Sequence, residues 1–275
     1  MISTFLDKLV ASKRSRIEEA KRSVDVVGLS RAAVEISTKK TPNRLQTALQ
    51  RTDRINIIAE FKRASPSKGM ISDRLDAEEV ANMYTNGGAC AISVLTEEDY
   101  FLGSLNDLRR IRENVDLPIL RKDFLVDDYQ ILESAAAGAD AILLIASILS
   151  PESLMRLQKL ANDFGLDAVI EVHDREEIEI AIEVDAKIIG VNNRNLETFE
   201  VSLDTSRALI EHAPKGSILI SESGISSPEQ IAELRRVGYS GFLIGESLMR
   251  SNDPQRMLEE LASFDEDVLE VSGSQ

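Results

Sequence analysis

Residues 55–69 read Ile-Asn-Ile-Ile-Ala-Glu-Phe-Lys-Arg-Ala-Ser-Pro-Ser-Lys-Gly, an apolar run that ends in charged residues and enters a polar loop. Side chains alternate between the two faces of a strand, so Ile58, Glu60 and Lys62 are predicted to share one side. A carboxylate and an ammonium on the inner face of a buried strand are costly unless they are paired or used. A single strand of this kind is equally compatible with an exposed strand end that carries two ordinary charges. The rest of the chain is needed to distinguish these two interpretations.

The pattern recurs along the chain in eight short runs rich in Ile, Leu and Val, which begin at residues 55, 90, 118, 140, 167, 187, 217 and 241. Stretches with helical periodicity separate the runs, and Ser150-Pro151 and Ser227-Pro228 are typical helix starts. Gly138 and Gly238 suit the left-handed end of a helix. Eight strand–helix units predict a (β/α)8 TIM barrel. An open doubly wound sheet is the alternative, but the Gly-rich dinucleotide turn that it usually carries is missing.

No linker divides the sequence, so one domain over residues 1–275 is predicted. An N-terminal extension of two or three helices is expected over 1–50, in which Phe5, Leu6 and Leu9 mark one apolar face. The barrel is expected over 55–250. The last residues, 264–275, are acidic and end in Ser and Gly, which predicts a frayed tail.

Composition limits the class of partner. The 275 residues carry a net charge of −15, which argues against binding to nucleic acid or to an anionic membrane surface. No apolar run approaches the roughly 20 residues of a membrane span, and no signal-peptide core is seen. A cytoplasmic monomer is expected. The single cysteine, Cys90, excludes an internal disulfide and is predicted to be a buried, inert thiol.

Polar side chains gather at one end of the predicted strands. The run ends supply Glu60, Lys62, Lys122, Glu171, Asn192, Arg194, Glu222 and Ser223, whereas the run starts supply little that is polar. The C-terminal ends of all barrel strands meet at one face, where active sites lie, so these side chains are predicted to converge. Together with Arg63, Lys68 and Arg121 they predict a cationic mouth and a small anionic substrate.

Two loops suggest that this substrate carries a phosphate. Ser223-Gly224-Ile225 follows the seventh run and Gly245-Glu246-Ser247 follows the eighth, where such barrels commonly build a phosphate site from backbone N–H groups. Ser65 and Ser67 are expected to face them from the first loop. Ordinary turn glycines are the alternative. The charge of Glu246 would have to point away from any phosphate.

The chain resembles the indole-3-glycerol phosphate synthase family of tryptophan biosynthesis, in motifs that cover residues 58–69, 120–124, 170–173, 190–196, 220–225 and 243–247. The resemblance extends over nearly the whole chain, and its first motif is the most specific. It implies a lyase that converts 1-(2-carboxyphenylamino)-1-deoxyribulose 5-phosphate to indole-3-glycerol phosphate, with release of CO2 and water and without a cofactor. No metal is expected, since neither histidine has companions at ligand spacing.

The resemblance also implies roles for individual residues. Lys122 would be the general acid, and Glu171 would be the base or the group that orients Lys122. Glu60 and Lys62 would serve the dehydration and the placement of the substrate. The implied polar lining of the pocket is Asn192, Arg194, Glu222 and Ser223. The implied phosphate-binding residues are Ser65, Lys68, Gly224, Gly245, Glu246 and Ser247. The implied apolar slot for the benzoate ring is formed by Phe101, Phe124 and Leu143.

An ordinary lysine is a weak acid, so Lys122 is predicted to have a lowered pKa, caused by burial and by a nearby ammonium such as that of Lys62. His173 is read as a loop residue with a structural hydrogen bond rather than as the base, and His212 as a surface residue. Two rival functions remain. One is a barrel of the phosphoribosylanthranilate isomerase type, which uses a cysteine at the end of the first strand, where this chain has Glu60 and Lys62. The other is a non-catalytic barrel.

Overall fold

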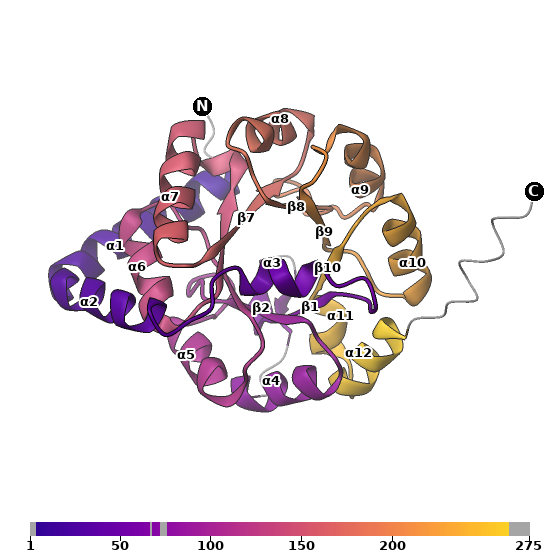
Figure 1. Ribbon diagram of the computed structural model, residues 1–275, viewed down its shortest axis with the longest axis horizontal. Helices are drawn as coiled ribbons and strands as arrows, with labels where there is room; N and C mark the ends of the chain where they lie inside the picture. The colour runs from indigo at the N-terminus through magenta and orange to yellow at the C-terminus, as the bar shows by residue number, and fades with distance from the viewer. Residues whose placement is uncertain (1–3, 67, 72–75, 264–275) are drawn as a thin grey trace, which may run out of the picture.

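A computed structural model of the chain describes residues 4–66, 68–71 and 76–263, so the predicted tail over 264–275 lies outside the described residues. Eight parallel strands close into a barrel in the order β1-β10-β9-β8-β7-β6-β5-β4 (Figure 1). These strands confirm the eight predicted runs: β1 Ile57–Phe61, β4 Ala91–Leu95, β5 Ile119–Lys122, β6 Ala141–Ile145, β7 Asp167–Val172, β8 Ile188–Asn192, β9 Ile218–Glu222 and β10 Gly241–Ile244.

Helices alternate with the strands and surround the barrel (Figure 1). As the sequence predicts, the side chain of Ser150 caps α7 (Pro151–Asp163) and that of Ser227 caps α10 (Pro228–Val237). Gly138 ends α6 (Asp128–Ala137) with a φ of 90°. The outer helices are α4 Ala77–Asn86, α5 Leu105–Asn114, α6 Asp128–Ala137, α7 Pro151–Asp163, α8 Arg175–Glu183, α9 Asp204–Leu209, α10 Pro228–Val237, α11 Glu246–Arg250 and α12 Pro254–Ala262, with short 3-10 turns at Ala146–Ile148 and Ile210–His212.

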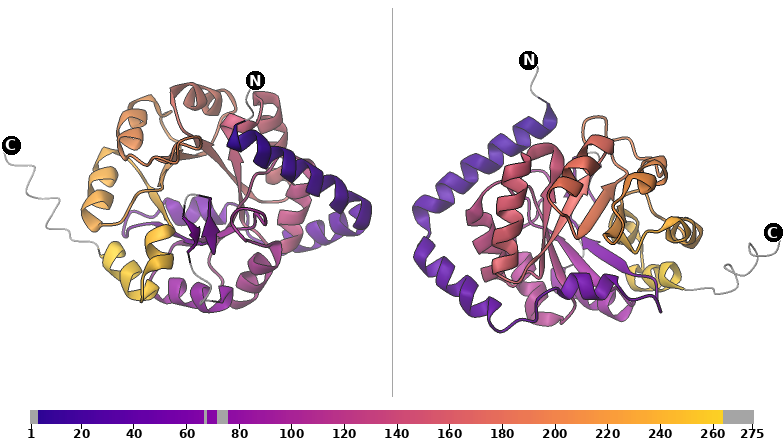
Figure 2. Two further views of the ribbon diagram at one scale, coloured as in Figure 1. Left: turned by 180° about the vertical axis from the view of Figure 1, so that it is seen from behind. Right: turned by 45° about the horizontal axis from the view of Figure 1, so that its top comes forward.

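Three helices precede β1 in the N-terminal extension: α1 Phe5–Ser23, α2 Val26–Ser37 and α3 Arg44–Leu49. α3 crosses one end of the barrel in Figure 1, while α1 lies at the opposite end in Figure 2. The position of α3 follows from a buried contact, because the backbone N–H groups of Leu45 and Gln46 donate to the Asp167 carboxylate at the start of β7. α3 therefore closes the N-terminal end of the barrel.

Strand alternation divides the core into two clusters. The inner cluster fills the barrel with residues such as Ile58, Leu120 and Val169. The outer cluster, with residues such as Ile57 and Ile170, packs between the strands and the surrounding helices. Both faces of a closed parallel sheet are therefore buried, which explains the near-continuous apolar runs. A polar side chain that continues an inner row must lie inside the barrel.

The N-terminal end of the barrel is more polar than the sequence predicts. Asp140, at the start of β6, is 2% exposed and accepts hydrogen bonds from Lys40, Arg44 and Arg112. Asp167 is also buried, and burial raises its pKa to about 6 despite the two backbone hydrogen bonds from α3. The prediction that run starts supply little polar chemistry is wrong, because these aspartates anchor the N-terminal extension to the barrel.

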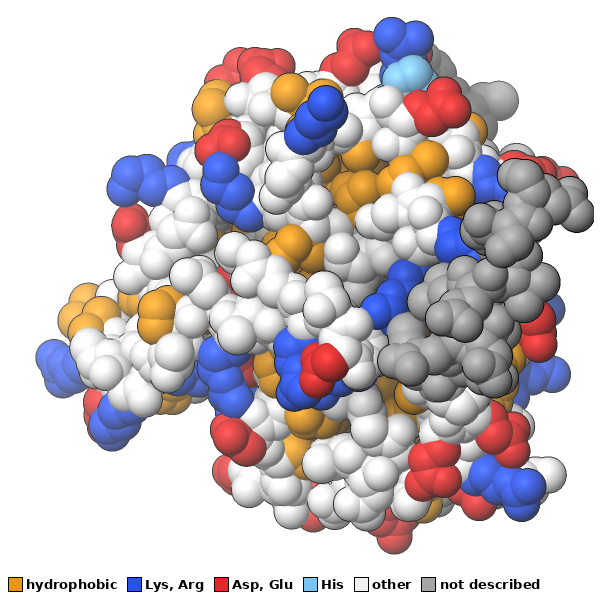
Figure 3. Space-filling model, turned by 45° about the vertical axis from the view of Figure 1, so that its right-hand side comes forward, with side chains coloured by type: hydrophobic (Ala, Val, Ile, Leu, Met, Phe, Trp, Pro, Cys, Tyr) orange, Lys and Arg blue, Asp and Glu red, His pale blue; other side chains and the backbone are white. Residues whose placement is uncertain are grey.

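A short hairpin replaces part of the loop expected after the first strand: β2 Ala64–Ser65 pairs with β3 Gly69–Met70. It lies over the same end of the barrel as α1 (Figure 2). Elsewhere, acidic and basic side chains are interspersed over the face in Figure 3. Among the described residues, no helix has both the length and the apolar composition needed to cross a bilayer.

Candidate active site

A cavity of about 590 Å³ opens at the C-terminal ends of the strands. Among the described residues, the predicted catalytic and binding residues line it with the exceptions of Ser65, Arg63 and Arg121. The lining of the described residues comprises Glu60, Lys62, Lys68, Leu95, Phe101, Lys122, Asp123, Phe124, Leu143, Ile145, Glu171, Asn192, Arg194, Leu196, Phe199, Val201, Glu222, Ser223, Gly224, Ile225, Ser226, Leu243, Ile244, Gly245, Glu246, Ser247 and Arg250. The structure thus brings together residues from every part of the barrel.

Lys122 lies at the centre of the polar groups. Its ammonium donates to Glu171 Oε2 at 2.8 Å and to Glu222 Oε2 at 2.8 Å. Both carboxylates are almost fully buried, with side chains 2% and 1% exposed. One ammonium therefore holds two carboxylates from strands β7 and β9, which lie on either side of β8.

A hydrogen-bonded chain extends from Glu171 to the loop after β9. Asn192 Nδ2 donates to Glu171 Oε1 at 3.2 Å, and Asn192 Oδ1 accepts from the Ser223 hydroxyl at 2.9 Å. Ser223 has a φ of 68° and lies in the loop that follows β9. The neighbouring Asn193, which the sequence analysis does not single out, donates to the Ser223 carbonyl oxygen at 3.1 Å and fixes this turn.

Glu60 and Lys62 form a second pair, with Lys62 Nζ 2.6 Å from Glu60 Oε1. Gly245, in the loop after β10, lies against this pair. A Cβ added at Gly245 would stand 2.5 Å from Glu60 Oε1. Glycine is therefore required there for the close approach of the β10 loop to the Glu60 carboxylate.

The predicted lowering of the Lys122 pKa is wrong. Burial by itself lowers this pKa, but Glu171, Glu222 and Glu60 together outweigh burial and raise it above the usual range of lysine. The predicted lowering rested on neighbouring cations, whereas the groups that reach the ammonium are carboxylates. Lys122 is consequently a fully charged ammonium at neutral pH.

The two carboxylates that share Lys122 differ in acidity. Burial raises the pKa of both; for Glu171 the charges of Lys122 and His173 overcome burial and hold its pKa well below the usual range. For Glu222, burial and the repulsion from Glu171 and Glu60 prevail over Lys122, and its pKa rises to about 7. The environment thus separates a permanently ionised glutamate from one that titrates near neutrality.

The cavity has an apolar side. Phe101, Phe124 and Leu143 all line it, and the Phe101 and Phe124 ring centroids are 6.4 Å apart. Phe199 also belongs to the lining, and Phe5 of α1 contacts its ring edge-on at 5.4 Å. The apolar contribution of the loop after β8 was not predicted from the sequence. Its signal is the apolar pattern of Leu196, Phe199 and Val201 within a polar segment.

A phosphate site is expected at the loops after β9 and β10. Gly224 has a φ of 82° next to Ser223, and both loops line the cavity. Glu246 is held by Arg194, with Nη2 at 3.3 Å from Oε2, and by Arg250, with Nη1 at 3.7 Å from Oε1. The negative charge of Glu246 is therefore directed to two guanidinium groups.

Ser65 lies in β2 of the hairpin and does not line the cavity. Its side chain is buried, and its Oγ has no hydrogen-bond partner among the described residues. Ser67, also expected to face the phosphate loops, lies outside the described residues.

The predicted cationic mouth is not found. Five Lys or Arg and five Asp or Glu side chains line the cavity in the described part of the chain. Arg121 alternates with Lys122 on β5, so it points outward and pairs with Asp123 and Glu133. Arg63 pairs with Asp107 on α5. Neither arginine lines the cavity, whose charge is balanced rather than positive.

The remaining candidates are placed as follows. Cys90 is buried at the start of β4, and burial raises its pKa to about 12, as expected of an inert thiol. His212 is exposed, and His173 bonds to Glu177 beside Glu171. In the described part of the chain, no group of three or more His, Cys, Asp or Glu side chains is placed to hold a metal ion.

Acids, bases and glycines that converge at the C-terminal ends of the strands define a (β/α)8-barrel enzyme. Solved structures share this fold. The 3-hexulose-6-phosphate synthase from Salmonella typhimurium superposes with a TM-score of 0.61, over 75% of this chain and 96% of that chain, at 14% sequence identity. That likeness concerns the fold alone.

Sequence comparison is more specific. The model of the family described as indole-3-glycerol phosphate synthase matches residues 6–261. The indole-3-glycerol phosphate synthase of Carboxydothermus hydrogenoformans is 45% identical over 94% of this chain and 99% of its own length. The protein of the same name from Lachnoclostridium phytofermentans is 42% identical over 94% and 99%. The chain belongs to the indole-3-glycerol phosphate synthase family.

Proposed function

We propose that the cavity closes the indole ring of 1-(2-carboxyphenylamino)-1-deoxyribulose 5-phosphate. The ring carbon that carries the carboxylate bonds to the ribulose carbonyl carbon, and the carboxylate leaves as CO2. The former carbonyl oxygen then leaves as water, with a proton taken from the neighbouring carbon. The observation that carries this proposal is the Lys122 ammonium, held by two buried carboxylates in a cavity with an apolar side and two glycine-containing loops.

Lys122 acts as the proton donor to the carbonyl oxygen. A lowered pKa is not needed for this role, because an alkoxide that develops in the transition state is a stronger base than an amine. A fixed ammonium also stabilises the developing negative charge electrostatically. Of the two roles that the resemblance leaves open for Glu171, the permanently ionised state favours orientation of Lys122. Glu222, which titrates near neutrality, is the proton acceptor.

The other site residues position the substrate. Lys62, held by Glu60, binds the substrate carboxylate before it departs, and Phe101, Phe124 and Leu143 hold the benzoate ring. The loops with Gly224, Gly245, Glu246 and Ser247 bind the phosphate through backbone N–H groups, assisted by Lys68. Remote phosphate binding of this kind supplies orientation to the reacting atoms. Asn192, Ser223 and Arg194 form the polar side of the cavity.

We expect the protein to act in the cytoplasm as a monomer, without a cofactor and without nucleic acid. The test is incubation of the purified protein with the carboxyphenylamino substrate, with indole fluorescence and CO2 release measured together. Both signals should appear in equal amounts. A parallel incubation with phosphoribosylanthranilate tests the isomerase alternative, since isomerisation releases no CO2. Turnover of that compound alone, or of neither compound, would refute the proposal.

A further inference from the structure

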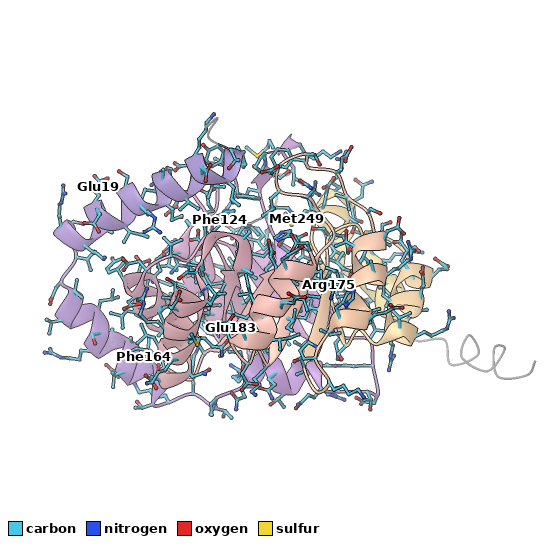
Figure 4. The ribbon with its side chains drawn as sticks, turned by 90° about the horizontal axis from the view of Figure 1, so that it is seen from above. Glu19, Phe124, Phe164, Arg175, Glu183 and Met249 are labelled. Atoms are coloured by element: carbon cyan, nitrogen blue, oxygen red, sulfur yellow. The ribbon has the colours of Figure 1, made fainter. Side chains whose placement is uncertain are left out.

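His173 is held in one orientation by a residue outside the cavity. It directly follows β7, and Glu177 lies in the first turn of α8, whose ends Arg175 and Glu183 are labelled in Figure 4. A single oxygen, Glu177 Oε2, accepts the backbone N–H of His173 at 2.8 Å and lies 3.0 Å from its ring Nδ1. Because Glu177 takes Nδ1, the other ring nitrogen, Nε2, is directed elsewhere.

That other nitrogen faces Glu171, one of the two carboxylates that bind the Lys122 ammonium. His173 Nε2 lies 3.3 Å from Glu171 Oε1. The charged groups facing the imidazole are thus Glu171 from β7 and Glu177 from α8. Burial lowers the pKa of His173, but these two carboxylates raise it to about 10, so the ring is an imidazolium at neutral pH.

The imidazolium makes the two carboxylates around Lys122 unequal. Glu171 faces two cations, Lys122 from β5 and His173, and Asn192 also donates to it. Glu222 from β9 faces Lys122 and the negative charges of Glu171 and of Glu60 from β1. Its Oε1 is buried without a hydrogen-bond partner among the described residues. Without the second cation, both glutamates would compete for a single ammonium.

We propose that His173 and Glu177 are positioning residues, which hold Glu171 as a fixed, ionised partner of Lys122 and so leave proton acceptance to Glu222. The kinetic part of this inference rests on the proposed function. Its structural part, the charged state of His173, does not. The two parts can therefore be tested separately.

The first experiment measures His173 directly and needs no substrate. The chain has two histidines, so the His212→Gln variant leaves one imidazole signal for NMR titration. His173 should titrate above pH 9, and its pKa should fall toward the ordinary value of about 6.5 when Glu177→Gln is added. A His173 that titrates near 6.5 with Glu177 intact would overturn the proposal, whether or not the protein turns over the substrate.

The second experiment measures the pH dependence of kcat. His173→Gln removes a positive charge beside Glu171 and so raises the pKa of that carboxylate. Because Glu171 then competes with Glu222 for Lys122, the acid limb of the profile should move to higher pH by about one unit. His173→Lys restores the charge and should move the limb back, and His212→Gln should leave it unchanged. A lower kcat with an unmoved limb would mean a purely structural role and overturn the proposal. Absence of turnover in the unmutated protein refutes the proposed function instead, and the titration then decides alone.

Discussion

The Glu222 carboxylate occupies the space that a side chain at position 190 would fill. A Cβ added to Gly190 would stand 2.1 Å from Glu222 Oε1. Gly190 lies on β8, paired with Glu171 on one neighbouring strand and with Ile220 on the other. The absence of a side chain at this inner position leaves room for the Glu222 carboxylate, which reaches the same ammonium as Glu171.

The first prediction is that Gly190→Ala separates Glu222 from Lys122. The substitution needs no unusual backbone, since the φ of Gly190 is not positive, so the barrel should still form. Displacement of the carboxylate by about 1 Å should lower kcat by about 10²-fold. Overpacking should also cost about 1–3 kcal/mol of stability.

Steady-state kinetics and thermal unfolding check the Gly190→Ala prediction. Gly28→Ala on α2 is the matched control, because its new methyl group would meet mainly the carboxylate of Asp25, which caps α2 and does not line the cavity. The control should keep full activity. An equally active Gly190→Ala would show that the position of Glu222 is not critical.

The second prediction concerns Lys122→Met. Product formation should fall by at least about 10³-fold, because the proton donor is lost while the apolar stem remains. Removal of the ammonium also leaves Glu171 and Glu222 buried together without their shared cation. Stability at neutral pH should therefore drop by about 3 kcal/mol.

A second substitution separates these two effects of Lys122→Met. Adding Glu222→Gln removes one of the two buried charges, so the double variant should recover part of the lost stability in denaturant unfolding. It should remain inactive. Measurable turnover by either variant would contradict the role of Lys122.

The arrangement of the inner residues could be predicted from the sequence. Alternation with a period of two places Glu60 in the row of Ile58, and Glu171 in the row of Val169. Because parallel strands of a closed barrel present the same end to one face, the ends of separate runs had to meet. Local pattern and one topological rule therefore suffice to locate the cavity.

The electrostatics could not be predicted in the same way. The partners of Lys122 lie 49 and 100 residues away in the sequence, so its pKa depends on contacts that no local pattern encodes. The error for Arg121 has a different origin. Its neighbour Lys122 points inward, and alternation, applied to both residues, would have placed the arginine outside the cavity.

The third prediction follows from the raised pKa of Glu222, about 7 in the folded protein. A carboxyl group with a raised pKa binds its proton more tightly in the folded state, so its contribution to stability decreases as pH rises from about 4.3 to about 7. Glu222→Gln stays neutral and should lack this decrease. In urea unfolding, the variant should gain stability relative to the unmodified protein across this range and match it most closely below pH 4. A constant difference at all pH values would contradict the assignment.

The fourth prediction concerns the contact between α1 and the residue that follows Lys122. Lys13 Nζ lies 2.9 Å from Asp123 Oδ1 and 2.8 Å from Glu98 Oε2, and the Asp123 side chain is fully buried. Lys13→Met should destabilise the protein by about 2 kcal/mol, since Asp123 loses one of its two cations and keeps only Arg121. Denaturant unfolding measures this difference, and Lys159→Met, which breaks an exposed ion pair with Asp163, is the matched control.

The pH dependence of the Lys13→Met effect distinguishes an ion pair from simple packing. Burial by itself raises the pKa of Asp123, but Lys13 and Arg121 outweigh burial and lower this pKa. The stabilisation by the Lys13–Asp123 ion pair is therefore present above the unfolded pKa of Asp, about 4, and is lost as the pH falls further. Burial lowers the pKa of Lys13, but Asp123 and Glu98 raise it, so the stabilisation persists up to about pH 10. The stability difference should therefore be largest between these limits. If it were the same at pH 3 and pH 7, the contribution of Lys13 would come from its apolar stem and not from its charge.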